Sequence, residues 1–237
     1  RPKRLKTFSS HSMPFQALVD VDFWMTDIVT EDNVIFFQCF LKYDGNYRVI
    51  PLYFPVYMDA NVSESFYETA ANVYRQHRRW GWGVETIPYM LFGFLKNKKI
   101  PVRKKIAQSF DYIESFWSWS TNSFIIAIFG WLPGIAGGIE FKTSILALNL
   151  PDVAGGIGSF AMIFLVFSAF FSINLLLLKT EGYKKRQFVW LALQWLFTPL
   201  VMTTLIAIPA LDAQTRLMFG KYMGFWNTPK YRKNYSK

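Results

Sequence analysis

Hydrophobic residues are distributed unevenly along this chain, and their spacing predicts its elements. Three stretches, at 118–136, 157–178 and 188–211, are almost continuously apolar. A helix of about 20 apolar residues crosses a hydrocarbon core of about 30 Å, so we expect these stretches to span a membrane. Before residue 118, polar and apolar positions alternate at shorter periods, which predicts a water-facing half.

Two helices are predicted in that water-facing half. Residues 32–43 suit a helix that is capped by Thr30 and closed by Gly45. The run Ser65-Phe-Tyr-Glu68 has the residues of a capping box and opens a second helix, which we expect to end at Gly81.

Between these helices, residues 46–58 predict a strand. They are rich in Tyr, Val, Ile and Phe and follow turn residues, although Pro51 and Pro55 are unfavourable in the middle of a sheet. A strand that alternates with helices implies an α/β unit, here too small to be a whole domain.

A basic, amphipathic segment joins the two halves of the chain. Cations precede an apolar stripe at helical spacing that consists of Ile106, Phe110, Ile113 and Trp117. An ordinary surface helix would show the same pattern. A basic helix that leads into a membrane span more often lies in the headgroup plane against anionic lipid, and we favour that interpretation.

Composition and charge agree with a membrane protein. The chain is 52% hydrophobic and 19% aromatic, with a net charge of +10. Residues 1–118 hold 15 basic and 12 acidic groups, whereas 119–178 hold one Lys, one Glu and one Asp. Four cations lie in the link 179–187, so the positive-inside rule places this link and the first half in the cytoplasm.

Few residues offer metal or disulfide chemistry. Cys39 is the one cysteine, which excludes an internal disulfide and suggests a buried small apolar residue. His11 and His77 have no Cys or carboxylate at ligand spacing, so no metal site is expected around them. The chain opens Arg-Pro-Lys-Arg without Met, and we expect it to be a piece of a longer protein.

Two short motifs carry candidate chemistry. Asp32 of the triplet Thr30-Glu31-Asp32 is expected in a first helical turn, where free N–H groups keep a carboxylate ionised and able to accept a proton. Plain capping explains the triplet alone equally well, and is commoner. Gln76, Arg79 and Trp80 share one helical face, and they suit a phosphate and a sugar ring.

Together, a TED triplet, a QxxRW run some forty residues later and the membrane stretches resemble the membrane-bound family-two glycosyltransferases, which include cellulose, chitin and hyaluronan synthases. A third element is similar to the FxVTxK gating loop of cellulose synthases. It is the run Phe225-Trp-Asn-Thr228-Pro-Lys230, with Asn227 where Val is usual. The resemblance covers almost the whole chain, and QxxRW is its most specific motif.

The resemblance implies roles for these residues. Asp32 would be the general base that deprotonates the acceptor hydroxyl for an inverting attack on the donor. The residues implied in substrate binding are Glu31, Gln76, Arg79, Trp80, Phe225, Thr228 and Lys230. Among them, Trp80 would stack on the acceptor sugar, and the C-terminal residues would close over the nucleotide.

The resemblance also implies Mg²⁺ or Mn²⁺ in the complete enzyme, held by a DxD motif far upstream. Asp20-Val21-Asp22 has that spelling but stands only ten residues before the TED triplet. We therefore assign no metal ligand in this chain, and we expect the nucleotide-binding half with its own DxD to lie outside it.

The resulting prediction is an α/β plus membrane α-helical protein. Residues 1–84 would be the C-terminal portion of a GT-A domain, 85–117 interfacial helices, 118–211 a transmembrane bundle and 212–237 a basic segment with the gating-like motif. We expect transfer of sugar from a nucleotide-sugar, with a UDP-sugar as the preferred donor, to a growing polysaccharide at the plasma membrane or bacterial inner membrane. A lipid glycosyltransferase, similar to ceramide glucosyltransferases, and a non-catalytic membrane subunit are the alternatives. The partners would be a nucleotide-sugar, a polysaccharide or lipid acceptor and membrane lipid, without nucleic acid.

Overall fold

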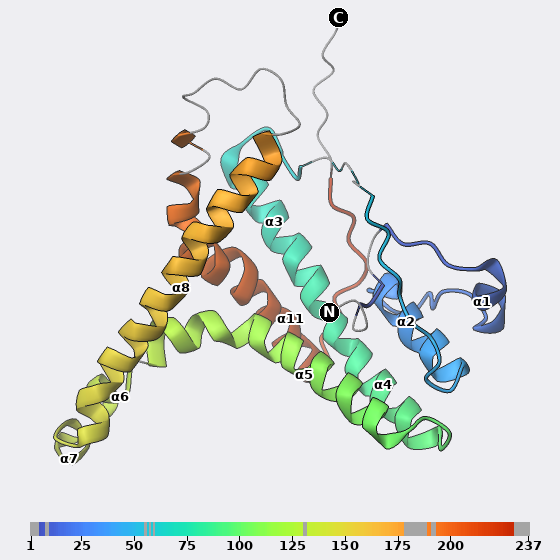
Figure 1. Cartoon of the computed structure of the whole chain (residues 1–237), viewed down its shortest axis with the longest axis horizontal. Coiled ribbons are helices and arrows are strands. Elements are labelled where there is room, and N and C mark those ends of the chain that lie inside the picture. Colours follow the sequence, from blue (N-terminus) through green and yellow to red (C-terminus); the bar gives the residue numbers. More distant parts are fainter. Residues whose placement is uncertain are drawn as a thin grey trace, which may run out of the picture. The chain divides into compact units, whose positions relative to one another are not determined.

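The computed structural model describes residues 5–7, 10–54, 56, 58, 60–129, 132–177, 189–190 and 193–229. All regular elements in these residues are helices (Figure 1). In chain order they are α1(Phe15–Asp20), α2(Glu31–Lys42), α3(Phe66–Gly81), the 3₁₀ helix η2(Trp82–Glu85), α4(Thr86–Lys96), α5(Val102–Phe124), the π-helix η3(Ile125–Phe129), α6(Leu132–Ala136), α7(Ile139–Lys142), α8(Ile145–Leu177), the 3₁₀ helix η4(Gln194–Phe197), α10(Thr198–Val201), the π-helix η5(Met202–Ala207) and α11(Ile208–Met218).

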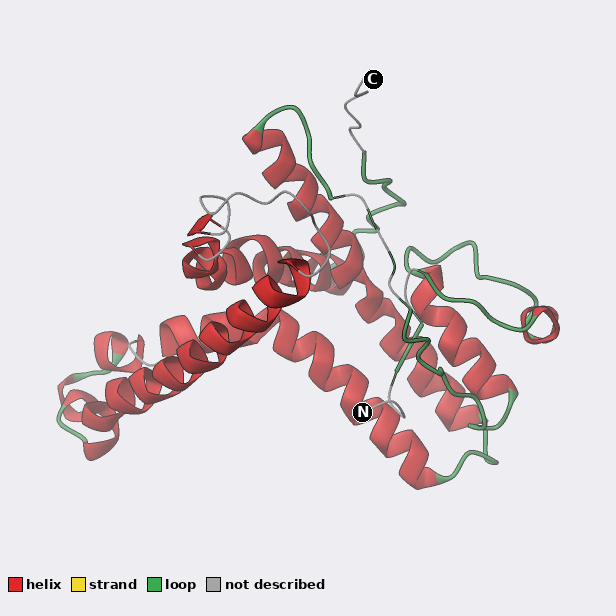
Figure 2. Ribbon diagram, turned by 45° about the horizontal axis from the view of Figure 1, so that its top comes forward, coloured by secondary structure: helices red, strands yellow, loops and turns green. Residues whose placement is uncertain are grey.

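The predicted α/β portion of a GT-A domain is wrong. Figure 2 shows helices and loops but no strand in the described part of the chain. Within the predicted strand, the described residues 46–54 are extended but irregular, and Ile50, Leu52 and Phe54 are exposed. A strand is stable only when a neighbour completes its hydrogen-bond ladder, and the described chain supplies no second strand.

The two helices predicted in the water-facing half are confirmed. Helix α2 begins and ends within a residue of its expected bounds, and Gly45 takes a φ of +79° while its N–H donates to the Phe40 carbonyl at 2.7 Å. Helix α3 begins where Ser65 caps it, because the Ser65 hydroxyl accepts from the Glu68 N–H at 3.2 Å. Both boundaries depend on residues close in sequence.

Gly81 is the last residue of α3, but the chain does not turn there. Its φ of −61° is right-handed, and the chain continues through η2 into α4. A Cβ on Gly81 would lie 2.8 Å from the Cα of Ala210 and 3.4 Å from the Cβ of Ala213. This glycine therefore permits the close approach of α11 to α3, and does not act as the helix stop that its position suggested.

The structure divides into two compact units. The first unit consists of Arg1–Ser118 and Ile208–Lys237, and the second unit consists of Trp119–Ala207. The core of the first unit contains the fully buried side chains of α2, such as Val34, Phe37 and Cys39. The prediction that Cys39 is a buried, apolar-like residue is thus confirmed.

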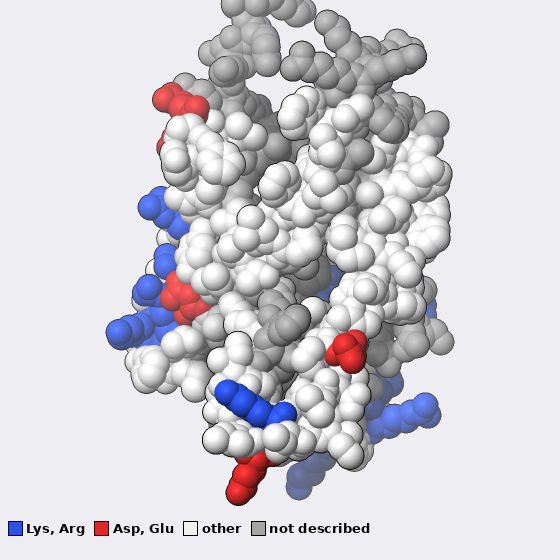
Figure 3. Space-filling view, turned by 90° about the vertical axis from the view of Figure 1, so that its left-hand side faces the viewer, with Lys and Arg blue, Asp and Glu red and all other residues white. Residues whose placement is uncertain are grey.

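Two helical segments are long and apolar enough to cross a membrane, namely Ile145–Asn174 and Gln194–Met218. In Figure 3 the middle of the view is mostly white, and the charged side chains lie mainly along its left edge and in its lower part. Of the three predicted spans, 157–178 and 188–211 overlap these segments. The stretch 118–136 is divided among α5, η3 and α6 instead. The link 179–187, with its four cations, lies outside the described residues.

Candidate functional site

The segments that carry the three motifs all belong to the first unit. The TED triplet starts α2, the QxxRW run is the last turn and a half of α3, and the gating-like run follows α11. A cluster of buried apolar side chains brings these segments together. It is formed by Val29, Trp82 and Ala213, with Leu217 and Met223 packed against it.

The TED triplet lies at the N-terminus of α2, as predicted. Glu31 and Asp32 occupy the first turn, and both side chains are partly buried. The N–H groups of a first turn have no partner within the helix, so both carboxylates lie next to free hydrogen-bond donors.

Thr30 precedes this turn, but it does not cap it with its side chain. Its hydroxyl makes no bond to the helix and instead donates to Oε1 of Glu85 at 3.4 Å. The carbonyl of Thr30 accepts the N–H groups of Asn33 and Val34, both at 3.1 Å. The predicted capping by the Thr30 side chain is therefore wrong, because a residue far away in sequence takes its hydroxyl.

The QxxRW residues lie on one face of α3. Gln76 accepts a hydrogen bond from Asn61 Nδ2 at 3.2 Å, and Trp80 contacts His77 edge-on with ring centroids 5.1 Å apart. Trp80 is nevertheless 44% exposed, so much of its indole surface is free for contact. An exposed indole offers the kind of surface on which sugar rings stack.

The gating-like run lies against the same helix. The Arg79 guanidinium lies 5.3 Å from the centroid of the Phe225 ring, and the Arg75 guanidinium lies 6.0 Å from that of Trp226. Gly220 and Gly224, with φ of +65° and +66°, adopt left-handed conformations in the segment just before this run. The structure therefore brings Phe225 to the QxxRW arginine, whereas Lys230 lies outside the described residues.

Two buried polar atoms here have no hydrogen-bond partner among the described residues, namely Nε of Arg79 and Oγ1 of Thr228. Such atoms are rare in folded proteins, because an unpaired buried donor or acceptor costs about 1–3 kcal/mol. Nε of Arg79 and Oγ1 of Thr228 are each a donor of the kind that binds an anionic oxygen.

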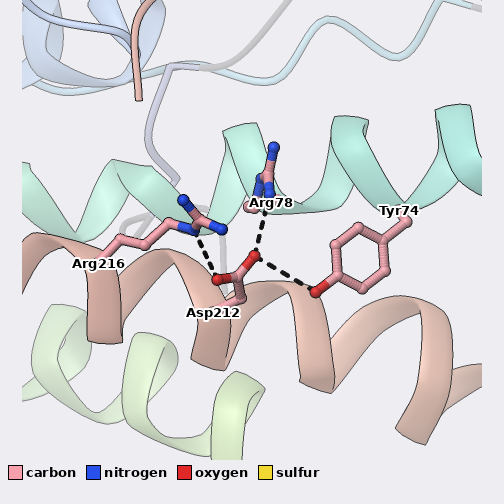
Figure 4. A network of polar contacts seen from close by, with 4 residues as sticks. All are labelled: Tyr74, Arg78, Asp212 and Arg216. Carbon is pink, nitrogen blue, oxygen red and sulfur yellow. Dashed lines mark hydrogen bonds and ion pairs between the residues drawn. The ribbon is translucent and has the colours of Figure 1, made fainter. Parts of the chain in front are cut away.

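Helix α11 is fixed to α3 by an ionic network (Figure 4). Asp212 accepts from Arg78 Nη1 at 3.1 Å, from Arg216 Nε at 2.7 Å and from the Tyr74 hydroxyl at 3.3 Å. Arg78 lies between Gln76 and Arg79 in sequence but points to α11. The network therefore holds the helix from which the gating-like run emerges.

The Asp20-Val21-Asp22 run does not form a metal site in the described residues. Asp20 accepts hydrogen bonds from the Tyr43 hydroxyl at 2.6 Å and from Gln16 Nε2 at 2.8 Å, and the bond from Tyr43 is the main reason that its pKa is lowered. No group of three His, Cys, Asp or Glu side chains that could hold a metal ion occurs among the described residues.

Sequence inspection missed Glu85. Its carboxylate accepts from the Val29 N–H at 3.0 Å, from Thr30 and from the Trp82 indole N–H at 2.9 Å. Burial raises the pKa of Glu85, and these hydrogen bonds lower it by less. One signal was available, because Glu85 is the one charged residue between Gly81 and Leu95.

A cavity of about 1020 Å³ lies elsewhere in the first unit, between the segment after α2 and the start of α5. Its lining includes Phe36, Tyr47, Lys104 and Gln108, but none of the predicted site residues. The cavity is therefore separate from the candidate site.

Comparisons with protein-family models, with curated protein sequences and with solved structures found no match to this chain.

Proposed function

We propose that this chain contains the acceptor-side part of a membrane-bound, inverting glycosyltransferase that extends a polysaccharide from a nucleotide-sugar, most simply a UDP-sugar. One observation carries the proposal. Three segments that match the motifs of such enzymes are far apart in sequence, yet they meet in one compact unit. Unrelated motif matches would have no physical reason to converge.

In this mechanism Asp32 is the general base. It takes the proton of the acceptor hydroxyl while that oxygen attacks the anomeric carbon of the donor from the face opposite the nucleotide. One C–O bond forms, the bond to the diphosphate oxygen breaks, and the configuration at the anomeric carbon inverts. The exposed face of Trp80 stacks on the terminal acceptor sugar and orients its hydroxyl towards the donor.

Arg79 and Thr228 bind the departing diphosphate. Each has a buried polar atom without a partner among the described residues, and a guanidinium binds phosphate oxygens more specifically than an ammonium does. Gln76 helps to bind the acceptor end beside them, Glu31 lines the same turn as Asp32, and Phe225 covers Arg79. Lys230, outside the described residues, would complete this cover.

The carboxylates among the described residues do not fit the Mg²⁺ or Mn²⁺ of such enzymes. Asp20 is engaged by Tyr43 and Gln16, and the described residues contain no three-ligand group. We therefore assign no step to a metal held by this chain. The donor's nucleotide and any metal would be bound by a portion of the protein outside residues 1–237.

The membrane segments suit export of the product. Two crossings, by the segments around α8 and η4–η5, return the chain to the side on which it started. Residues before 118 and the gating-like run after residue 218 would then share the cytoplasm, as the contact between Arg79 and Phe225 requires. The exposed apolar side chains of Ile106, Phe110 and Trp117 on α5 would lie in the headgroup region.

The test uses the protein expressed from its native gene, in isolated membranes supplied with radiolabelled UDP-glucose, UDP-N-acetylglucosamine or UDP-glucuronate. We expect a high-molecular-mass product with at least one donor. Asp32→Asn should lower its rate about 10²–10⁴-fold, since the amide cannot accept the proton. Asp27→Asn, a change at an exposed carboxylate five residues earlier, is the matched control and should leave the rate unchanged.

Three outcomes would overturn the proposal or part of it. Transfer by Asp32→Asn within tenfold of the wild-type rate would remove Asp32 from the role of base. A labelled glycolipid of one sugar, without polymer, would replace chain extension with single transfer to a lipid. Absence of any glycosidic product with all donors would favour a non-catalytic membrane subunit.

A further inference from the structure

The Glu85 carboxylate accepts hydrogen bonds from two segments whose relative position matters for the proposed reaction. Its Oε1 accepts from the backbone N–H of Val29 and from the hydroxyl of Thr30, and its Oε2 accepts from the indole N–H of Trp82. Val29 and Thr30 directly precede the turn that carries Asp32. Trp82 directly follows the QxxRW helix and is 1% exposed.

All of these groups are donors, which matches an ionised carboxylate with acceptor capacity on both oxygens. Hydrogen bonds to a charged acceptor are stronger than bonds between neutral groups. A partly buried carboxylate is nevertheless expensive, and the raised pKa of Glu85 reflects that cost. An apolar residue would suit this otherwise uncharged stretch better if packing alone were needed.

The surrounding packing leaves the turn dependent on this carboxylate. The Thr30 hydroxyl does not cap α2, so the N-terminus of this helix lacks the usual side-chain N-cap. A Cβ on Gly83 would lie 3.3 Å from Asn33 Nδ2 and 3.2 Å from the Phe116 ring, so η2 runs very close to the first turn of α2. Glu85 is thus placed to fix the backbone from Val29 onwards.

We propose that Glu85 is a positioning residue that holds the turn of Asp32 against the end of the QxxRW helix. It acts through Val29, Thr30 and Trp82 and does not touch the substrate. The proposal rests on the proposed function only in taking Asp32 as the base. The link between Glu85 and the turn can be measured without any transfer reaction.

The experiment compares Glu85→Ala and Glu85→Gln in the full chain in detergent or nanodiscs, and in the native gene product for kinetics. Glu64→Ala, at an exposed carboxylate before α3, is the matched control. In Glu85→Ala, hydrogen exchange at the amides of residues 29–33 should accelerate about tenfold or more, which corresponds to the loss of one charged hydrogen bond. Exchange in α11 and α4 should stay as in the wild type.

Glu85→Gln keeps one acceptor oxygen but turns the other acceptor into a donor, so it should give a smaller increase in exchange. In the kinetic assay, kcat should fall about 10–100-fold in Glu85→Ala while the donor KM changes less than twofold, because a displaced base slows chemistry without weakening nucleotide binding. Glu85→Gln should recover part of kcat.

The two proposals fail in different ways. If the wild type makes no glycosidic product but exchange still accelerates only at residues 29–33, the link by Glu85 stands and the proposed function falls. If transfer occurs but Glu85→Ala leaves both Val29 exchange and kcat within twofold of wild type, the positioning role is wrong. If Glu85→Ala loosens the whole first unit, Glu85→Gln decides, and an unchanged kcat there overturns the role.

Discussion

Each of the two compact units contains a helix with several large apolar side chains, but these side chains are buried in the first unit and exposed in the second. In the first unit, α2 buries Val34, Ile35 and Phe37 almost completely within the protein. In the second unit, α8 leaves Phe160, Phe167 and Phe170 largely exposed, and it is apolar around its whole circumference. The protein surrounds the first helix, whereas nothing described in the second unit covers the other. By its length and composition, such a helix is able to cross a membrane.

The largest expected effect comes from deleting a phenylalanine of each helix. Phe37→Ala, at a side chain with 0% exposure, should lower the free energy of unfolding by about 3–5 kcal/mol, because it opens a cavity that the core cannot fill. Phe167→Ala, at 57% exposure in α8, should cost well under about 1 kcal/mol, since lipid or detergent closes around the smaller residue. Thermal unfolding of both variants in the same detergent measures the difference.

Equal destabilisation by the two variants would break the comparison, because it would mean that α8 is also covered by protein. A negligible effect of Phe37→Ala would instead show that the core around α2 is not packed as described.

A middle-sized effect is expected where two helices of the first unit approach most closely. Gly81→Ala would place a Cβ 2.8 Å from the backbone of Ala210, so α11 must move away from α3. We expect a loss of about 1–3 kcal/mol, as for other overpacked sites. The Asp212 bonds to Arg78 and Tyr74 should weaken with it, because they cross the same interface.

The matched control is Gly156→Ala in α8, where no heavy atom lies within 4 Å of the added Cβ. It should be neutral or stabilising by up to about 1 kcal/mol, since alanine is the better helix former. If the two substitutions have the same effect on thermal unfolding, the close contact between α3 and α11 is not present in solution.

Local features of the fold could be predicted from the sequence. The bounds of α2, the Ser65 cap of α3 and the positive φ of Gly45 all follow from residues within about five positions of one another. The apolar stretches also pointed to the two segments that are long enough to cross a membrane. Each of these features depends on nearby residues or on composition alone.

Features that depend on distant partners could not be predicted. The segment 46–54 has the composition of a strand but lacks a paired neighbour in the described residues, so it stays irregular. Threonine is a common helix cap, but the Thr30 hydroxyl donates to Glu85 instead. Glycine often ends a helix, but Gly81 instead lies close to Ala210. For Thr30 and Gly81, a contact with a residue 50 or more positions away overrides the local preference.

In the candidate site, too, local features could be predicted from the sequence and contacts between distant residues could not. The residue types of the three motifs indicated the chemistry, and the placement of Asp32 in a first turn was local and correct. The contact of Arg79 with Phe225 was expected only through the family resemblance, and Glu85 was not expected at all. A single buried carboxylate in an apolar run is the one signal that could have identified it.

The smallest expected effect concerns pH, and it should arise in the first unit, which holds Glu85. Because burial raises the pKa of Glu85, the folded state binds its proton more tightly than the unfolded state does. Its contribution to stability is therefore complete below the ordinary glutamate pKa and is lost as the pH rises through the raised value. Asp20 acts in the opposite sense. The Tyr43 hydrogen bond lowers its pKa, so its contribution to stability is lost as the pH falls.

The variant Glu85→Gln does not titrate at this position and leaves Asp20 in place. The difference in unfolding free energy between wild type and variant therefore reports on Glu85 alone. Urea unfolding between pH 4 and 7.5 should show the wild type gaining stability relative to Glu85→Gln as the pH falls. A difference that is flat with pH, or that grows towards pH 7.5, would mean that the Glu85 carboxylate is not buried against Val29 and Trp82.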